Sequence, residues 1–155
     1  MTRRVVAMAA MAVGLAAAPA DPVTWKLEAP AAVKAGARFE AKLRAAVRGG
    51  WHIYSLTPAA DGPIATRIWV GEGQVFSAAG AVRAPGARVT QDASFGVEVE
   101  TYEGGVEFGV PVKVAAEAEA GVRKLVVSAR YQSCNQKICL APKTVEVEAA
   151  VAIGK

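Results

Sequence analysis

Apolar and polar positions alternate with a period of two over much of this 155-residue chain. From Leu125 to Tyr131 every second residue is apolar, and Val145 and Val147 are separated and flanked by polar residues. A period of two is typical of strands that bury one face and expose the other. These two stretches therefore predict a pair of antiparallel strands, with the residues between them in a connecting loop.

The same pattern predicts strands almost throughout the region after residue 20. The predicted strands are Val23–Glu28, Arg38–Val47, Trp51–Leu56, Thr66–Val70, Val97–Tyr102, Val106–Val114, Gly121–Ser133 and Lys143–Ala152. Turn-forming residues such as Asp61-Gly62-Pro63 separate them, and residues 115–120 are enough for a helical turn but too few for a stable helix. Short strands with glycine and proline between them predict one all-β domain, a sandwich.

The first twenty residues have the organisation of a secretory signal peptide. Arg3 and Arg4 precede an uncharged apolar run over residues 5–20, which ends at Ala20 with an A-x-A pattern. The run is shorter than the roughly 20 residues of a membrane-spanning helix, so cleavage is favoured over a retained anchor. We expect a mature domain of residues 21–155 in the periplasm, where disulfides persist.

The charged residues give no sign of a nucleic-acid partner. Loss of residues 1–20 removes Arg3 and Arg4 and lowers the formal net charge from +4 to +2. The remaining basic residues are scattered along polar strand faces, without the basic cluster and interleaved aromatic residues that bind nucleic acid. We therefore interpret the charges as solvated faces of strands.

Two cysteines, Cys134 and Cys139, are separated by four residues. A metal site is the weakest interpretation, because structural zinc takes four N/S ligands and the remaining candidate, His52, is distant in sequence. A structural disulfide is the second interpretation, although so short a loop gains only about 2 kcal/mol from chain entropy. A redox-active dithiol is the third, because Lys137 between the cysteines favours the reactive thiolate. Local sequence leaves the last two interpretations open.

Two further stretches contain candidate site residues. The strand-like segment Gly50–Pro58 places His52 and Tyr54 on one face, either as surface groups or as the lining of a site. Histidine titrates near neutral pH, so His52 could help to ionise a thiol. In the polar loop Gln91–Gly96, Phe95 is either a core anchor or a shield over a reactive group.

Together these segments resemble the amino-terminal periplasmic domain of the thiol:disulfide interchange protein DsbD. The matching segments are residues 50–54 (GWHIY), 95–108 and 131–142 (YQSCNQKICLAP), which occur in the order and spacing of that family. The resemblance covers nearly the whole expected mature chain, and the cysteine segment is its most specific part. It implies an immunoglobulin-like antiparallel β-sandwich whose cysteine pair exchanges disulfides.

The resemblance also implies roles for individual residues. Cys139 is expected to form mixed disulfides with partners, and Cys134 to resolve them. The expected neighbours of this catalytic pair are His52, Tyr54, Tyr131 and Lys137. The best-known family members have tyrosine at the position of His52, and they have one more residue between their cysteines.

A cap loop is the last site element that the resemblance implies. Asp92, Ser94 and Phe95 fall in the loop that covers the disulfide in this family until a partner arrives. Either Ser94 or Phe95 takes the place of the family's capping aromatic residue, since the alignment allows both.

For partners, the resemblance implies a thioredoxin-like electron donor, a membrane electron transporter, and exported disulfide-containing proteins as clients. DsbD continues into a membrane domain and a thioredoxin-like domain, whereas the sequence here ends at Lys155. The thioredoxin-like electron donor and the membrane electron transporter are therefore expected to act in trans, as separate proteins. The exchange requires no cofactor and no metal. The alternative function is a binding module that uses the same fold with a structural disulfide and no turnover.

Overall fold

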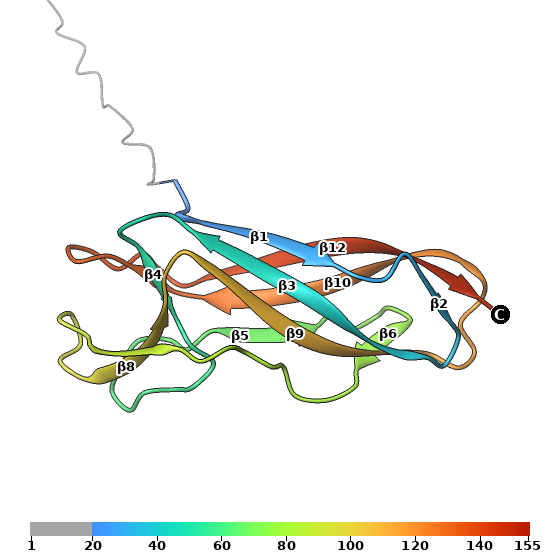
Figure 1. Ribbon diagram of the computed structural model, residues 1–155, viewed down its shortest axis with the longest axis horizontal. Coiled ribbons are helices and arrows are strands. Elements are labelled where there is room, and N and C mark those ends of the chain that lie inside the picture. The colour runs from blue at the N-terminus through green and yellow to red at the C-terminus, as the bar shows by residue number, and fades with distance from the viewer. Residues whose placement is uncertain (1–19) are drawn as a thin grey trace, which may run out of the picture.

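The computed structural model of the chain describes residues 20–155. The predicted signal peptide lies outside these residues, apart from Ala20. The described part of the chain forms twelve strands and no helix, so the prediction of an all-β fold is confirmed. Figure 1 shows the strands as an elongated sandwich. Within residues 20–155 there is no helix of the length and hydropathy needed to cross a bilayer.

The first layer of the sandwich is a four-stranded antiparallel sheet in the order β1-β3-β9-β6. Its strands are β1 (Val23–Glu28), β3 (Arg38–Val47), β9 (Gly105–Val114) and β6 (Phe76–Ala78). In β3 every second residue from Ala41 to Val47 is buried and the residues between are exposed. Leu43 of β3 lies opposite Phe108 of β9, and both are fully buried. Burial of each such side chain contributes about 2 kcal/mol.

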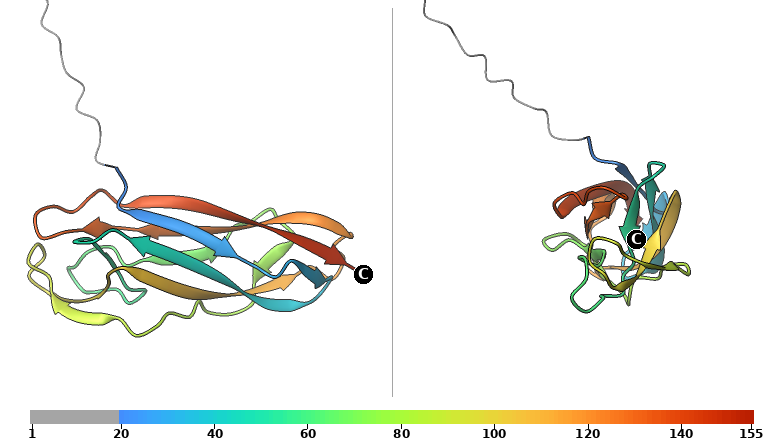
Figure 2. Two further views of the ribbon diagram at one scale, coloured as in Figure 1. Left: turned by 45° about the horizontal axis from the view of Figure 1, so that its top comes forward. Right: turned by 90° about the vertical axis from the view of Figure 1, so that its left-hand side faces the viewer.

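The second layer has the order β2-β12-β10-β5. Its strands are β2 (Ala32–Lys34), β12 (Lys143–Gly154), β10 (Gly121–Tyr131) and β5 (Arg67–Val70). The predicted pair of β10 and β12 is antiparallel and runs from Gly121 opposite Ile153 to Tyr131 opposite Lys143. Leu125 on β10 is fully buried in the core shared with the first layer. Figure 2 shows the two layers from the side and from the end.

A third, smaller sheet closes one end of the sandwich, at the left in Figure 1. Its order is β11-β4-β8-β7, with β11 (Ser133–Cys134), β4 (His52–Tyr54), β8 (Glu98–Tyr102) and β7 (Arg88–Gln91). One face of this sheet contributes Ile53 and Tyr102 to the main core. The opposite face buries Tyr54, Val99 and Cys134 in a separate cluster. Successive residues of a strand point to opposite faces, so β4 serves both clusters.

Some elements differ from the sequence prediction. The short strands β2, β6 and β7 were not predicted, because three or four residues give too little alternation to recognise. The predicted strand Trp51–Leu56 is shorter and consists of β4, whereas Gly121–Ser133 is divided between β10 and β11. Residues 115–120 form a turn in which Ala118 N donates to Ala115 O at 3.2 Å, and no helix.

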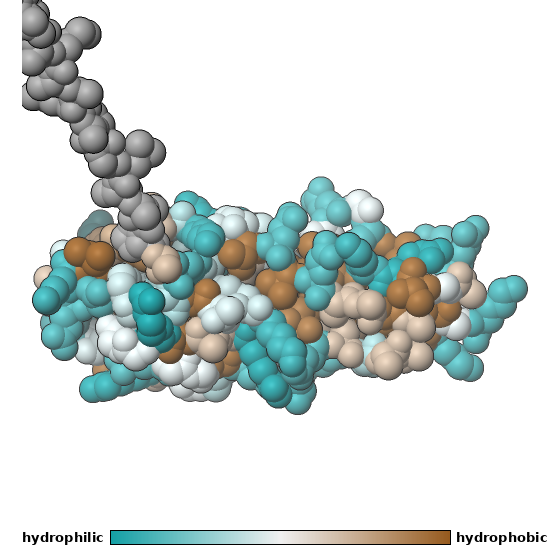
Figure 3. Space-filling model, turned by 90° about the horizontal axis from the view of Figure 1, so that it is seen from above, coloured by the Kyte–Doolittle hydropathy of each residue, from teal (hydrophilic) through white to brown (hydrophobic). Residues whose placement is uncertain are grey.

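Hydrophilic residues cover much of the face seen in Figure 3, with apolar residues between them. Charged side chains line the exposed faces of the strands. Several of them pair between neighbouring strands. Arg44 of β3 lies 2.7 Å from Glu107 of β9, and Lys124 of β10 lies 2.8 Å from Glu148 of β12. Both pairs are exposed to solvent, where screening keeps the contribution of an ion pair small.

Candidate active site

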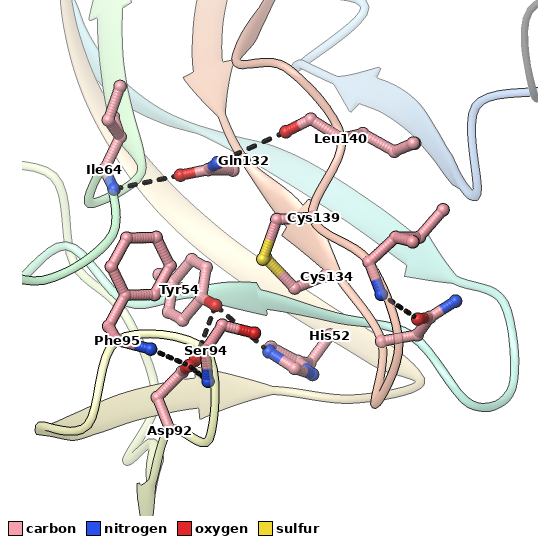
Figure 4. Close-up of a disulfide and its surroundings, with 12 residues drawn as sticks. His52, Tyr54, Ile64, Asp92, Ser94, Phe95, Gln132, Cys134, Cys139 and Leu140 are labelled. Carbon is pink, nitrogen blue, oxygen red and sulfur yellow. Dashed lines mark hydrogen bonds between the residues drawn. A yellow bond between two sulfur atoms is a disulfide. The ribbon is translucent and has the colours of Figure 1, made fainter.

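Cys134 and Cys139 form a disulfide in the hairpin beyond the end of β10 (Figure 4). The two residues lie directly opposite each other, with 4.1 Å between their Cα atoms. The residues beside them make the backbone hydrogen bonds, such as the 2.9 Å bond from Leu140 N to Ser133 O. In such a non-hydrogen-bonded pair the side chains of opposite strands come closest together. The backbone of the hairpin therefore brings the two sulfur atoms together.

The two cysteines differ in their access to solvent. Cys134 is 1% exposed and belongs to the buried cluster with Tyr54 and Val99. Cys139 lies against that cluster and is only partly buried. The rate of thiol–disulfide exchange depends on which sulfur an incoming thiolate can reach. Cys139 is the more accessible of the two residues.

The tip of the hairpin is a tight turn organised by Asn135. Its side-chain Oδ1 accepts hydrogen bonds of 2.8 Å from the backbone N–H groups of Lys137 and Ile138. Asparagine favours such turns because its side chain mimics a backbone acceptor. The turn leaves the side chains of Lys137 and Ile138 exposed at the outer end of the hairpin.

The two arms of the hairpin have unequal lengths. Between the opposite pairs Tyr131–Lys143 and Cys134–Cys139, one arm has two residues and the other, Leu140–Pro142, has three. A surplus of one residue on one strand is the defining property of a β-bulge. With two residues in each arm, regular alternation would also keep Cys134 and Cys139 opposite each other on one face. The bulge therefore absorbs the extra residue and keeps the two cysteines opposite each other.

His52, Tyr54 and Asp92 form a hydrogen-bonded chain beside the disulfide. His52 lies opposite Cys134 in the pairing of β4 with β11. Its Nε2 atom is 3.3 Å from the hydroxyl oxygen of Tyr54, and that hydroxyl donates to Asp92 Oδ2 at 2.7 Å. Burial and the bond to Asp92 raise the pKa of the Tyr54 phenol, so it remains protonated at neutral pH. The strand register thus places His52 opposite Cys134.

The direction of these hydrogen bonds determines which nitrogen of the His52 imidazole carries the proton. Tyr54 has one hydroxyl proton and donates it to Asp92, so its oxygen can only accept from His52. A neutral His52 therefore carries its proton on Nε2 and has a free lone pair on Nδ1. Burial lowers the pKa of His52, and the carboxylates of Asp92 and Glu103 only partly offset that effect. Near neutral pH the imidazole is thus an uncharged base.

Asp92 also holds the predicted cap loop in place. Its Oδ1 atom accepts hydrogen bonds from the backbone N–H groups of Ser94 at 2.8 Å and Phe95 at 3.1 Å. Although burial raises the pKa of Asp92, the bonds from Tyr54, Phe95 and Ser94 lower it below its ordinary value. Figure 4 shows Asp92, Ser94 and Phe95 on the same side of the disulfide as Tyr54. Ser94 and Phe95 are both exposed at the surface of the loop.

An open cleft of about 460 Å³ lies between the cap loop and the hairpin. Its walls include His52 from β4, Ser94 from the cap loop, and Asn135 and Gln136 from the turn between the cysteines. Solvent therefore reaches His52 from the side of the cleft, while Cys134 itself stays buried.

The structure does not bring Tyr131 to this group of residues. Tyr131 is 1% exposed in the main core, and its ring centroid is 5.1 Å from that of Trp25. Its hydroxyl donates to Asp21 Oδ2 at 2.5 Å, and Lys143 Nζ lies 2.7 Å from the same oxygen. Burial and the bond to Asp21 raise the pKa of Tyr131. Tyr131 thus ties the base of the hairpin to the start of β1.

A family model described as "Thiol:disulfide interchange protein DsbD, N-terminal" matches residues 20–150 of the chain. This chain belongs to the DsbD amino-terminal domain family. The resemblance predicted from the segments around His52, Phe95 and the two cysteines is therefore confirmed. Membership in this family makes the chain a thiol:disulfide interchange family member with an immunoglobulin-like fold. No curated protein matches the sequence of the chain.

One solved structure shows the same fold at low sequence identity. The N-terminal periplasmic domain of ScsB from Proteus mirabilis matches with a TM-score of 0.57 and 15% identity. The match covers 83% of this chain but only 46% of the ScsB chain, so the chain spans less than half of that structure. An α-2-macroglobulin from E. coli matches with a TM-score of 0.41 and 14% identity over 87% of this chain and 7% of the other.

Sequence reasoning missed several residues around the disulfide of this DsbD-family domain. Glu103 was not singled out, yet it contributes to the electrostatic environment of His52. Asn135 follows Cys134 and has a recognisable local signal, since asparagine at the start of a short loop predicts a turn. Gln132 has no local signal, because it bonds to Ile64, which is 68 residues away.

Proposed function

We propose that the chain is an exported thiol:disulfide interchange protein that passes electrons through Cys134 and Cys139 to protein disulfides. The observation that carries the proposal is the disulfide with one buried and one accessible cysteine, beside an oriented histidine. Family membership supports the general activity. The relay and its clients are our inference from the geometry of the site.

The proposed cycle transfers two electrons in two exchanges. A thiolate of a thioredoxin-like donor attacks the sulfur of Cys139, and Cys134 leaves as a thiolate. The donor's second thiolate then releases Cys139, so the donor becomes a disulfide and the domain a dithiol. In the second exchange, Cys139 attacks a client disulfide, forms a mixed disulfide, and releases one client sulfur as a thiolate. Cys134 then attacks Cys139, restores the original disulfide, and releases the second client sulfur, so the client leaves as a dithiol.

His52 is suited to move the proton of Cys134 in this cycle. The free lone pair on Nδ1 can accept the thiol proton when Cys134 attacks, and the resulting imidazolium can return it when Cys134 leaves. Tyr54 and Asp92 orient the ring in the required tautomer. Activated nucleophiles in enzymes have the same arrangement, in which a third group orients the base that takes the proton.

Replacement of His52 with phenylalanine tests this role. We expect resolution of a mixed disulfide at Cys139 to slow at least about tenfold near neutral pH, because the base for Cys134 is lost. In the wild-type protein, the rate should fall as the pH drops through the pKa of His52, which burial places below 6.5. Stopped-flow kinetics of resolution against pH measures both effects. The phenylalanine variant should also show a higher apparent pKa for the attacking cysteine.

His52→Gln is the matched control for the proton-transfer role. Glutamine can still donate a hydrogen bond to Tyr54, but it cannot take up a proton at neutral pH. It should therefore be as slow as the phenylalanine variant. An unchanged pH–rate profile in both variants would assign His52 to the surface instead.

We further propose that the domain acts in the periplasm after removal of residues 1–20. Basic residues, an apolar run and a small-residue ending support this, together with family membership. The intact mass of the protein from the exported fraction should correspond to residues 21–155. A mass that includes Met1–Ala20 would contradict cleavage. The proposed partners are a thioredoxin-like donor and a membrane electron transporter, both in trans, and exported disulfide proteins.

The reduction potential of the pair tests exchange against a structural disulfide. A structural disulfide in an exported protein has a potential below about −300 mV, whereas an exchanging disulfide has a higher one. We expect the Cys134–Cys139 pair to lie above that value, as measured by equilibration with a dithiol of known potential. A lower value, together with no exchange with protein thiols, would favour a binding module stabilised by its disulfide.

A further inference from the structure

Gln132 connects the redox hairpin to a distant loop through both ends of its side-chain amide. Its Nε2 atom donates to the carbonyl oxygen of Leu140 at 3.2 Å, and its Oε1 atom accepts from the backbone N–H of Ile64 at 3.2 Å. Figure 4 shows both bonds beside the disulfide. One partner is an acceptor and the other a donor, so the orientation of the amide is determined by its surroundings.

The bond to Leu140 falls in the longer arm of the hairpin, directly after Cys139. That arm contains the surplus residue, which interrupts the regular ladder of backbone hydrogen bonds. Pro142 in the same arm has no N–H group to donate. The side chain of Gln132, on the shorter arm, therefore supplies a cross-arm hydrogen bond where the backbone ladder is interrupted.

Reduction of the disulfide removes the covalent link between Cys134 and Cys139. The hydrogen bonds of Gln132 do not involve the sulfur atoms, so they can persist when the disulfide opens. They hold the backbone that follows Cys139 against the shorter arm, and they hold both to the loop at Ile64. An intramolecular attack is fast only when the reacting atoms are kept close and correctly oriented.

We propose that Gln132 is a positioning residue that keeps Cys139 within reach of Cys134 while the disulfide is open. It thereby speeds the resolution of mixed disulfides at Cys139. This role rests on the proposed exchange function and adds to it a residue whose hydrogen bonds go to Leu140 and Ile64. The chemical step is unchanged: the Cys134 thiolate attacks Cys139, and the partner's sulfur leaves as a thiolate.

The experiment follows resolution with a small aromatic disulfide that releases coloured thionitrobenzoate. Attack of Cys139 on the reagent releases one thionitrobenzoate and leaves a second on Cys139. Attack of Cys134 on Cys139 then releases the second, and the proton of Cys134 passes through His52 to solvent. The rate of the second release therefore measures how well the hairpin positions the two cysteines.

Two variants remove the bonds of Gln132 in different ways. Gln132→Met keeps the length of the side chain and loses both bonds, whereas Gln132→Glu loses the donor to Leu140. We expect the second release to slow about fivefold in each, the equivalent of one hydrogen bond of about 1 kcal/mol. The first release should change little. The methionine variant keeps the test decisive if the glutamate variant does not fold.

Two comparisons separate positioning from charge and from stability. Gln132→Met adds no charge, so slow second release in both Gln132 variants does not come from a new carboxylate. Gln74→Glu weakens a second bridging glutamine, which bonds to Gly71 in its own loop and to Val126 of β10. It should lose about as much thermal stability as the Gln132 variants do and should resolve at the wild-type rate.

The outcomes distinguish this proposal from the proposed function. Slow second release confined to the Gln132 variants supports positioning. Equal rates in wild type and Gln132 variants, with normal first release, overturn the positioning role alone. A wild-type protein whose disulfide cannot be reduced by a protein thiol overturns the exchange function on which it rests.

Discussion

Cys134→Ser should accumulate stable mixed disulfides with a thioredoxin-like partner, whereas Cys139→Ser should form at least about tenfold fewer. In the first variant the accessible Cys139 remains and nothing can resolve its adduct. In the second variant the remaining Cys134 is 1% exposed and lies within a buried cluster. The measurement reduces each variant, adds a thioredoxin-like protein activated as a mixed disulfide, and counts covalent adducts on non-reducing gels.

The wild-type protein is the control for this experiment. It should form adducts only transiently, because Cys134 resolves them. Equal trapping by both variants would contradict the assignment of roles. If neither variant traps a partner and the wild-type disulfide resists reduction, the protein is better described as a binding module with a structural disulfide.

Deletion of Ala141 should leave the disulfide in place and remove the bulge. The deletion makes the two arms of the hairpin equal in length, so regular pairing keeps Cys139 opposite Cys134 on the same face. The cross-link and its contribution of about 2 kcal/mol to stability are then kept. Alkylation of the folded, air-oxidised protein followed by mass measurement should find both cysteines oxidised.

Ala141→Gly and Ala141→Ser are controls of unchanged length. Both keep three residues in the longer arm, so both should oxidise as the wild type does. If the deletion variant kept free thiols while these controls oxidised, the extra residue would be needed to bring Cys139 opposite Cys134.

The long strands could be predicted from the sequence because alternation over ten or more residues is a strong signal. β3 and β1 have the predicted bounds, and β9, β10 and β12 differ by one or two residues. The three unpredicted strands are short, and pairing with a neighbour defines them more than their own composition does. β7, for example, forms only because its residues pair with β8 at one end of the sandwich.

The candidate site could be predicted in part. The cysteines, His52, Tyr54 and the cap loop were recognisable because their residue types are chemically distinctive or match the family. Which cysteine His52 adjoins depends on the register of β4 against β11, and a one-residue shift would change the answer. Tyr131 was expected beside the cysteine pair because it opens the matching segment 131–142. Because side chains alternate between faces, Tyr131 points into the main core, whereas Cys134, three residues later, points to the opposite face.

The contact between Asp21 and the base of the hairpin has a practical consequence for attaching the domain to other molecules. Asp21 bonds to Tyr131 and Lys143, the last opposite pair before the cysteines. The C-terminus lies at the far end of the sandwich in Figure 1, because β12 runs the length of the molecule away from the hairpin. A fluorophore, fusion partner or surface linked through Lys155 would therefore leave the exchange end unobstructed. The same group joined at Asp21 would sit beside the incoming partner.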